Sequence, residues 1–218
     1  IDAKLFARAS VAYKHLPECM AADSKKIKKV IKKAMDAKRF EHTLGVEYTA
    51  CALAMCHNVD IEKAQMAGLL HDCAKCLSDE KKKALCVKNH MPITDIENKN
   101  PYLLHAKAGF CIARGKFHIK DRDILNAILY HTTGRPGMSE LEKIIYIADY
   151  IEPGRKQAPN LKEVRHLAFQ NLDAALFKIL CDTLSYLEET GSEVDTMTCK
   201  TCEYYRNVMN EKEVSHDR

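Results

Sequence analysis

The sequence contains little glycine and proline, with eight and six residues respectively among 218. A β-sandwich or β-barrel needs many tight turns, and this composition argues against both classes. No apolar run approaches the roughly 18 residues that a membrane-spanning helix requires. The start at Ile1 has neither an initiator methionine nor the basic and apolar regions of a signal peptide. We therefore expect a cytoplasmic protein that does not interact with a membrane, and leave open whether an upstream segment is missing.

The sequence also lacks a strong excess of charge of either sign. Its 34 lysine and arginine residues exceed its 30 acidic residues by four, too few to indicate a nucleic-acid-binding protein. Part of the excess lies between residues 25 and 33, where lysines alternate with apolar residues at helical spacing and no aromatic residues interleave for base stacking. This pattern predicts a solvated helix face, formed by Lys25, Lys26, Lys28, Lys29, Lys32 and Lys33.

Cysteine, by contrast, is frequent. Ten cysteines would indicate a disulfide scaffold in a small secreted chain, but this chain is neither small nor visibly secreted. We therefore expect free thiols in a reducing compartment, several of them acting as small apolar residues. Two Cys-x-x-Cys pairs, Cys73/Cys76 and Cys199/Cys202, have the spacing of zinc half-sites, yet nothing in the sequence brings the pairs together. A redox effect at the first pair stays open.

Helical periodicity runs from one end of the sequence to the other, and strand alternation is nearly absent. Capping residues mark several helix starts, namely Asp60, Ser78, Asp121 and Ser139. The expected helices cover residues 24–37, 39–57, 61–75, 78–88, 101–115, 121–131, 141–151, 160–189 and 200–210. No repeat or linker interrupts them. The sequence thus predicts one all-α domain over residues 23–210, with an extension at 1–22 and a tail at 211–218.

Titratable residues interrupt the apolar helices at three places. The apolar run 67–70 ends in His71 and Asp72, and a later run contains Asp149. An unpaired carboxylate buried in such a run costs several kcal/mol, so Asp149 needs a cation, a proton or water beside it. His42, near the start of another helix, is the third interruption. Two imidazoles and two carboxylates from separate helices are suitable ligands for a transition metal.

The order His42, His71-Asp72, Asp149 resembles the signature of the HD superfamily of metal-dependent phosphohydrolases. Four local stretches are similar to the bacterial YqeK-type HD family, namely RFEHTLGV at 39–46, AGLLHDCAK at 67–75, HTTG at 131–134 and ADYIEPGR at 148–155. The match extends over about residues 24–210. The resemblance implies a single HD-domain helical bundle with symmetrical bis(5'-nucleosyl)-tetraphosphatase activity, which cleaves diadenosine tetraphosphate to two ADP.

By this resemblance, the principal metal, typically iron in the family, is held by His42, His71, Asp72 and Asp149. Manganese, cobalt, nickel and zinc also suit imidazole-rich ligation, and magnesium suits it less. His105 and His131 match two further histidines of the family. They would bind a second metal or the product phosphates, with Asp72 bridging if two metals are present. Taken alone, His105 is interpreted as a core histidine and His131 as a helix C-terminal cap.

The family further implies contacts to the substrate from Arg39, Asp72, Cys73, Ala74, Lys75, His105, His131, Thr132, Asp149 and Arg155. Among these, Asp72 and Lys75 are the implied catalytic residues. The substrate chemistry gives these residue types a reason, because the negative oxygens of a polyphosphate anhydride repel a nucleophile. A metal neutralises those oxygens and makes hydroxide available near neutral pH, and cationic side chains clamp phosphate oxygens. Without the resemblance, the same cations are interpreted as solvated charges.

Two other functions remain open from the sequence. One is a different HD phosphohydrolase that acts on nucleoside monophosphates, nucleoside triphosphates or guanosine tetraphosphate. The other is a non-catalytic HD module that senses nucleotides and keeps the metal site without turnover. In each case the expected partner is a nucleotide, with no nucleic acid and no membrane, and a homodimer is compatible with the resemblance.

Overall fold

The structure, a computed structural model, describes residues 24–216, with side chains to residue 211. No strand occurs within this range, so the predicted all-α class is confirmed. The helices are α2 (Ser24–Ala34), α3 (Ala37–Cys56), α4 (Ile61–Leu70), α5 (Asp79–Lys88), α6 (Asp95–Lys99), the 3-10 helix η1 (Pro101–Leu104), α7 (His105–Gly115), α8 (Arg122–Tyr130), α9 (Glu140–Ile151), α10 (Leu161–Ala168), α11 (Leu172–Glu189) and α12 (Thr196–His216). The N-terminal extension expected at 1–22 lies outside the described residues.

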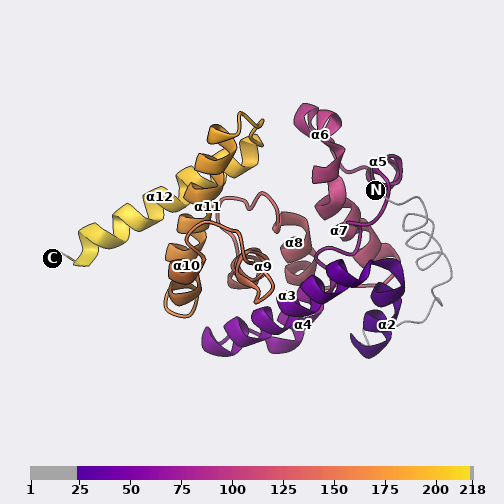
Figure 1. Ribbon diagram of the computed structural model, residues 1–218, viewed down its shortest axis with the longest axis horizontal. Coiled ribbons are helices and arrows are strands. Elements are labelled where there is room, and N and C mark those ends of the chain that lie inside the picture. Colours follow the sequence, from indigo (N-terminus) through magenta and orange to yellow (C-terminus); the bar gives the residue numbers. More distant parts are fainter. Residues whose placement is uncertain (1–23, 217–218) are drawn as a thin grey trace.

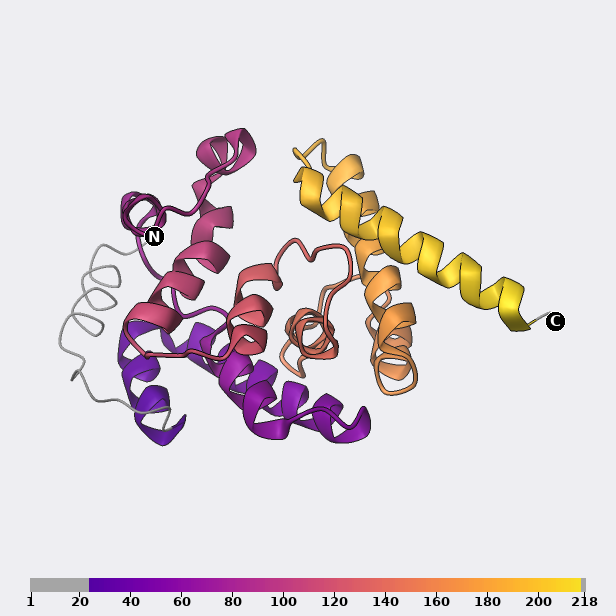
Figure 2. The ribbon, with the colours of Figure 1, turned by 180° about the vertical axis from the view of Figure 1, so that it is seen from behind.

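Four helices, α3, α4, α8 and α9, form the centre of the bundle (Figures 1 and 2). α3 packs along α4, and both contact α9, while α8 contacts α4 and α9. On one side of this centre, α7 packs against α8 and contacts α5 and η1. On the other side, α11 packs against α9 and is flanked by α10 and α12. The four central helices therefore set the positions of residues that come from distant parts of the sequence.

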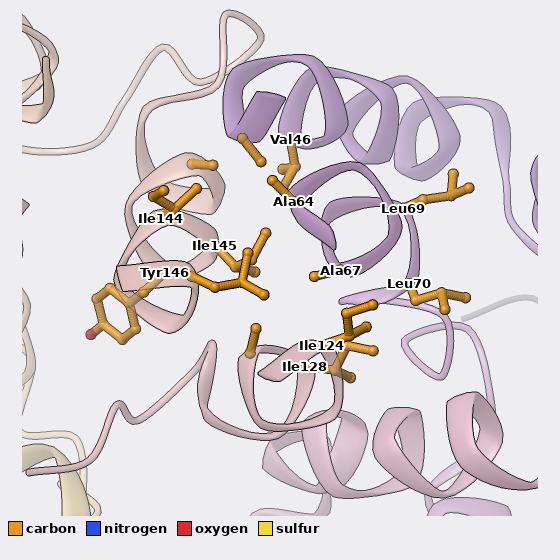
Figure 3. Packing of buried hydrophobic residues seen from close by; sticks show 14 of the residues in the cluster. Val46, Ala64, Ala67, Leu69, Leu70, Ile124, Ile128, Ile144, Ile145 and Tyr146 are labelled. Atoms are coloured by element: carbon orange, nitrogen blue, oxygen red, sulfur yellow. The ribbon is translucent and has the colours of Figure 1, made fainter. Parts of the chain in front are cut away.

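The hydrophobic core lies where these four helices meet (Figure 3). Val46 of α3, Ile128 of α8 and Ile145 of α9 are completely buried there. Burial of an aliphatic side chain of this size contributes about 1.5–3 kcal/mol relative to exposure. Close packing of α4 on α3 depends on Gly68, since a Cβ atom at this position would lie 3.0 Å from the Cα atom of Glu47.

Several helices begin at the capping residues that the sequence predicts. Each of these residues accepts a hydrogen bond from a backbone N–H two or three positions later, which is worth about 1 kcal/mol per helix: Asp60, Ser78, Asp121 and Ser139. The first predicted helix ends earlier than expected, at Ala34, because Asp36 caps the next helix by accepting from the amide of Arg39. These local signals fix most helix starts without help from tertiary contacts.

Two predicted helices were too long. α4 ends at Leu70 rather than at residue 75, because residues 71–77 form successive turns in which, for example, the amide of Cys73 donates to the carbonyl of Leu70. The predicted helix 160–189 is two helices, since the side chain of Asn171 accepts a hydrogen bond from an amide in the first turn of α11. The first of these breaks matters for the site, because it leaves His71 and Asp72 at a helix end.

Three further differences concern short or terminal elements. The prediction missed α6, whose five residues are too few to show a periodicity, although Thr94 and Glu97 form a capping box. It assigned residues 101–104 to an α-helix, and these residues form η1. The last helix was expected over 200–210, whereas α12 begins at Thr196 and continues to His216, into the predicted tail.

The exposure of the α2 lysines and the state of the cysteines test two predictions made from the sequence. Ile27, Ile31 and Ala34 of α2 are buried, and five of its six lysines are exposed as predicted. Lys28 is the exception, because its ammonium lies 2.8 Å from the buried carboxylate of Glu47. All nine cysteines among the described residues are free thiols. None of the described helices is long and apolar enough to cross a membrane.

Candidate metal centre

Four histidines and two aspartates from separate segments meet beside the core. His42 comes from α3, His71 and Asp72 from the end of α4, His105 from the first turn of α7, His131 from the end of α8, and Asp149 from α9. The imidazole ring centroids form a chain in which neighbours are 5.5 Å (His42 and His71), 5.1 Å (His71 and His131) and 5.0 Å (His105 and His131) apart. The structure therefore brings together all six residues that the sequence analysis assigned to metals.

Asp72 lies at the centre of this chain. Its Oδ2 atom is 3.6 Å from Nε2 of His71, and its Oδ1 atom is 3.4 Å from Nε2 of His105 and 3.7 Å from Nε2 of His131. Two sets of candidate metal ligands result, each with donor atoms within 4.8 Å of one another. One set is His42, His71 and Asp72, and the other is Asp72, His105 and His131. The two sets share the Asp72 carboxylate.

Three of the imidazoles are oriented by the same local contact. The Nδ1 atom lies 2.7 Å from the backbone carbonyl oxygen three residues earlier, in the pairs His71 with Gly68, His105 with Tyr102, and His131 with Ile128. A carbonyl oxygen can only accept, so Nδ1 carries the hydrogen and Nε2 holds a lone pair. Hydrogen bonds of this kind fix the ring orientation of metal-binding histidines.

The fourth imidazole is oriented by a carboxylate that the sequence analysis missed. Oε1 of buried Glu152 lies 3.1 Å from Nδ1 of His42, and Nε2 of the same ring faces Oδ1 of Asp149 at 3.1 Å. Glycine at position 45 leaves room for this contact, because a Cβ atom there would lie 2.6 Å from Glu152 Oε2. Glu152 follows the last residue of α9 and looks in the sequence like a solvated helix end, so no local pattern identifies it.

Three donor atoms of the centre lack a hydrogen-bond partner among the described residues. Nε2 of His42, Nε2 of His71 and Oδ1 of Asp72 are buried without a hydrogen bond. In addition, Nε2 of His105 lies 3.1 Å from Nε2 of His131. Buried polar atoms without partners are costly, and a cation between these atoms would satisfy them. The residues present therefore fit a metal.

For His71, His105 and Asp72 the pKa values favour the form that binds a metal. Burial lowers the pKa of His71 to about 4 and that of His105 well below its usual value, so both rings are neutral at pH 7. Burial alone would raise the pKa of Asp72, but His71 and Lys75 hold it well below the usual range. Burial likewise opposes charge on His42, yet Asp149 and Glu152 raise its pKa. A proton or a metal cation is thus stabilised between His42 and Asp149.

Nitrogen-rich ligand sets of this type suit iron, manganese, cobalt, nickel and zinc better than magnesium, which prefers oxygen ligands.

Asp149 differs from its expected position inside the core, since 24% of its side-chain surface is exposed. The centre therefore reaches solvent on the side of Asp149.

Three partly exposed cationic side chains contact the candidate ligands. Arg39 Nη1 is 2.8 Å from Oδ2 of Asp72, and the guanidinium of Arg155 is 2.9 Å from Oδ1 of Asp149. Lys75 Nζ lies 3.2 Å from His105 Nε2, and Thr132 Oγ1 lies at the same distance from that atom. The four residues predicted to contact phosphate oxygens are thus gathered around the metal ligands.

The remaining two predicted contacts, Cys73 and Ala74, are placed elsewhere. Both are buried in the hydrophobic core, and the Cys73 thiol points to the carbonyl of Gly109. Their position offers no surface to a substrate. Burial also raises the pKa of Cys73 and of Cys76, which keeps both thiols protonated and argues against the redox effect at this pair.

We expect Glu152→Gln to weaken metal binding about 10- to 100-fold, the usual effect of removing a residue that orients a metal ligand. The amide keeps the size of the side chain but loses the charge that holds the Nδ1 hydrogen of His42. The measurement is competition for the metal against a chromophoric chelator. Glu193→Gln, at an exposed carboxylate paired with Lys99, is the matched control. Equal metal affinity in the Glu152 and Glu193 variants would contradict the orienting role.

Comparison with known families identifies a match over the segment that holds these residues. The HD domain family matches residues 39–154. A crystal structure from Clostridium acetobutylicum, described as a predicted HD superfamily hydrolase involved in NAD metabolism, superposes with a TM-score of 0.82 at 42% sequence identity. That match covers 85% of this chain and 97% of the Clostridium chain.

Two curated relatives are similar over most of their length. A protein of Bacillus subtilis named symmetrical bis(5'-nucleosyl)-tetraphosphatase is 40% identical over 164 residues, which cover 75% of this chain and 87% of the relative. A protein of Halalkalibacterium halodurans with the same name is 40% identical over 172 residues, covering 79% of this chain and 91% of the relative.

Proposed function

Since this chain belongs to the HD-domain family, and within it to the group of the symmetrical bis(5'-nucleosyl)-tetraphosphatases, we propose that it hydrolyses diadenosine tetraphosphate to two ADP. The reaction is a metal-dependent hydrolysis of the central phosphoanhydride bond. The nucleotide is the partner of the site described above, and iron, as one or two ions, is the metal that we propose.

One observation carries this proposal. The carboxylate of Asp72 belongs to two sets of imidazole ligands, and three half-exposed cationic side chains surround them. A tetraphosphate carries about four negative charges over a short chain, and both a metal centre and flanking cations are needed to bind its middle. Arg39 and Arg155 also pair with Asp72 and Asp149, and their partly exposed guanidinium groups remain open to a polyanionic substrate.

In the proposed site His42, His71, Asp72 and Asp149 would hold the principal metal, and His105 and His131 would join Asp72 at a second position. A metal at this place supplies positive charge for the phosphate oxygens and lowers the pKa of nearby water. The protein contributes the orientation of the ligands. Each ring is held through its Nδ1 hydrogen, so that the Nε2 lone pair points into the centre.

The side chains around the opening position the phosphate chain. Arg39, Lys75 and Arg155 donate to phosphate oxygens on different sides of the centre, and the hydroxyl of Thr132 adds a neutral donor. Lys75 reaches both Asp72 and His105, and its ammonium would stabilise the charge that develops on the cleaved anhydride. The acid that protonates the departing ADP is not needed as a separate group, because a phosphate leaving group is a weak base.

The proposal predicts one nucleotide product. Protein loaded with iron under anaerobic conditions is incubated with diadenosine tetraphosphate, and the nucleotides are separated by chromatography. We expect ADP alone, because cleavage of the central anhydride bond gives two molecules of ADP and no other nucleotide. Removal of the metal with a chelator should abolish turnover, and iron or manganese should restore it far better than magnesium.

Two control variants accompany this assay. His71→Ala, which removes a buried ligand, should lose the ADP product, whereas His166→Ala, at an exposed histidine of α10, should retain it. AMP together with ATP would show asymmetric cleavage. Faster hydrolysis of guanosine tetraphosphate or of a nucleoside triphosphate would assign the chain to a different phosphohydrolase activity. Metal and nucleotide binding without any turnover would support the sensing module instead.

A further inference from the structure

The loop between α8 and α9, here called the site loop and defined as residues 132–138, connects two ligand-bearing helices. It follows His131 at the end of α8 and leads to Ser139, the N-cap of α9, which carries Asp149. Its first residue, Thr132, places Oγ1 3.2 Å from Nε2 of His105. The conformation of the site loop therefore determines the position of Thr132 beside His105.

The site loop is held from α12, a helix that lies beyond the segment matched by the HD domain family, residues 39–154. The backbone amide of Met138 donates a hydrogen bond of 3.0 Å to the hydroxyl oxygen of Tyr205. Tyr205 is only 2% exposed, so this oxygen replaces water as the acceptor for a buried amide. One end of the loop is thereby fixed by a single side chain of α12.

A second contact fixes the other end of the site loop. Gly134 has a positive φ of 65°, and a Cβ atom there would lie 2.7 Å from Cγ2 of Thr201, so the loop backbone packs directly on α12. The hydroxyl of Thr201 lies 2.7 Å from the carbonyl of Met197 in its own helix and 3.2 Å from the carbonyl of Thr133. Its single hydrogen is shared between these two acceptors, and Thr133 directly follows Thr132.

The middle of the site loop is tied to α9 and not to α12. Arg135 donates two hydrogen bonds of 2.8 Å to the carboxylate of Glu142, which is buried, and its guanidinium lies over the ring of Tyr130. The backbone amide of Glu142 donates to the Ser139 side chain, while the Glu142 side chain makes this ion pair. A bidentate pair of this kind holds the loop in one orientation, while α12 sets its two ends.

We propose that α12 is a positioning element of the active site: Tyr205, assisted by Thr201, holds the site loop so that Thr132 is presented to a phosphate of the nucleotide. The inference rests on the proposed function, because it assigns the role of Thr132 within that same site. The hydrogen bonds of Tyr205 and Thr201 within the described part of the chain go to Met138, Thr133 and Met197, and none of these residues is a candidate metal ligand. The effect of Tyr205 and Thr201 passes through the backbone of the site loop.

The test removes the hydroxyl of Tyr205 and leaves its buried ring in place. Tyr205→Phe removes the acceptor for the Met138 amide, and we expect it to weaken ADP binding to the metal-loaded protein about tenfold. Calorimetry gives the dissociation constant of ADP, and steady-state kinetics should show a rise in KM for diadenosine tetraphosphate with a smaller change in kcat. Metal content should stay at the wild-type value, since no ligand is touched.

Tyr204→Phe is the matched control. Tyr204 precedes Tyr205 on the same helix and stacks edge to face on its ring, but it is 41% exposed and its hydroxyl makes no hydrogen bond to the described part of the chain. The Tyr204→Phe variant should bind ADP as the wild type does. Thr201→Val, which keeps the methyl group against Gly134 and removes the hydroxyl, serves as the second variant and should weaken ADP binding in the same direction, with Thr201→Ser restoring it.

A double-mutant cycle separates positioning from general stability. In the background of Thr132→Val, the change Tyr205→Phe should alter the ADP dissociation constant less than about twofold, because the group that it positions is already absent. Equal tenfold losses in both backgrounds would overturn the inference, and so would a lower Tm with unchanged ADP affinity. A wild-type protein that fails to cleave diadenosine tetraphosphate overturns the proposed function; active wild type with unaffected Tyr205→Phe and Thr201→Val variants overturns the positioning role alone.

Discussion

Asp72→Asn is expected to lower kcat/KM for diadenosine tetraphosphate by on the order of a thousandfold or more, as for other residues on which a whole metal centre depends. The carboxylate contacts His71 on one side and His105 and His131 on the other, so one substitution affects both sets of ligands. An amide removes the negative charge that the metal and Arg39 require. Steady-state kinetics measures the loss of activity, and elemental analysis of the purified protein measures the loss of metal.

The control for this variant is Asp123→Asn. Asp123 is an exposed carboxylate at the start of α8 that pairs with Lys63, away from the centre. Asp123→Asn changes the net charge by the same amount as Asp72→Asn, and we expect its activity to lie within about twofold of the wild type. If Asp72→Asn retained a tenth of the wild-type activity and a full complement of metal, the shared carboxylate would not be the organising residue of the centre.

The helix starts could be predicted from sequence because their causes are local. Asp60 and Ser139 satisfy amides within three residues of themselves, so a short stretch of sequence contains the whole interaction. The ends of the helices were harder to predict from the sequence. α4 stops at Leu70 although the sequence pattern predicts a helix to residue 75. The residues that follow form turns, and Asp72 there contacts His105 and His131 from other helices, which no local pattern contains.

The candidate site was predictable to the extent that polar residues interrupt apolar helices. His71, Asp72 and Asp149 stand out in this way, and the family resemblance added His105 and His131. Glu152 could not be found by the same reasoning. It looks like a residue at an ordinary helix end, and only the approach of α9 to α3 brings it to His42.

The orientation of the histidines shows how the fold uses helix ends. The last carbonyl groups of a helix have no intrahelical donor. His71 and His131 each follow the last residue of a helix and donate Nδ1–H to one of these carbonyls, those of Gly68 and Ile128. One hydrogen bond therefore satisfies a helix end and turns a metal ligand inward. This hydrogen bond is local and requires no contact with another part of the chain.

Lys75→Met is the second substitution expected to have a large effect, a loss of about 10²- to 10³-fold in kcat/KM, which is typical when one group that stabilises charge in the transition state is removed. The ammonium lies 4.0 Å from Oδ1 of Asp72 and 3.2 Å from Nε2 of His105, and a third of the side chain remains open to solvent. It can therefore contact a phosphate without leaving the centre. Methionine keeps the length of the side chain and removes the charge.

The metal content distinguishes this variant from Asp72→Asn. Lys75 is a cation and cannot bind a metal, so Lys75→Met should retain the wild-type metal content while activity falls, and Lys75→Arg should recover part of the activity because it restores the positive charge. Lys88→Met, at an exposed lysine of the last turn of α5, controls for the loss of one surface charge. Loss of metal in Lys75→Met would mean that the ammonium supports the ligands, whereas intact metal with reduced turnover places its charge on the substrate.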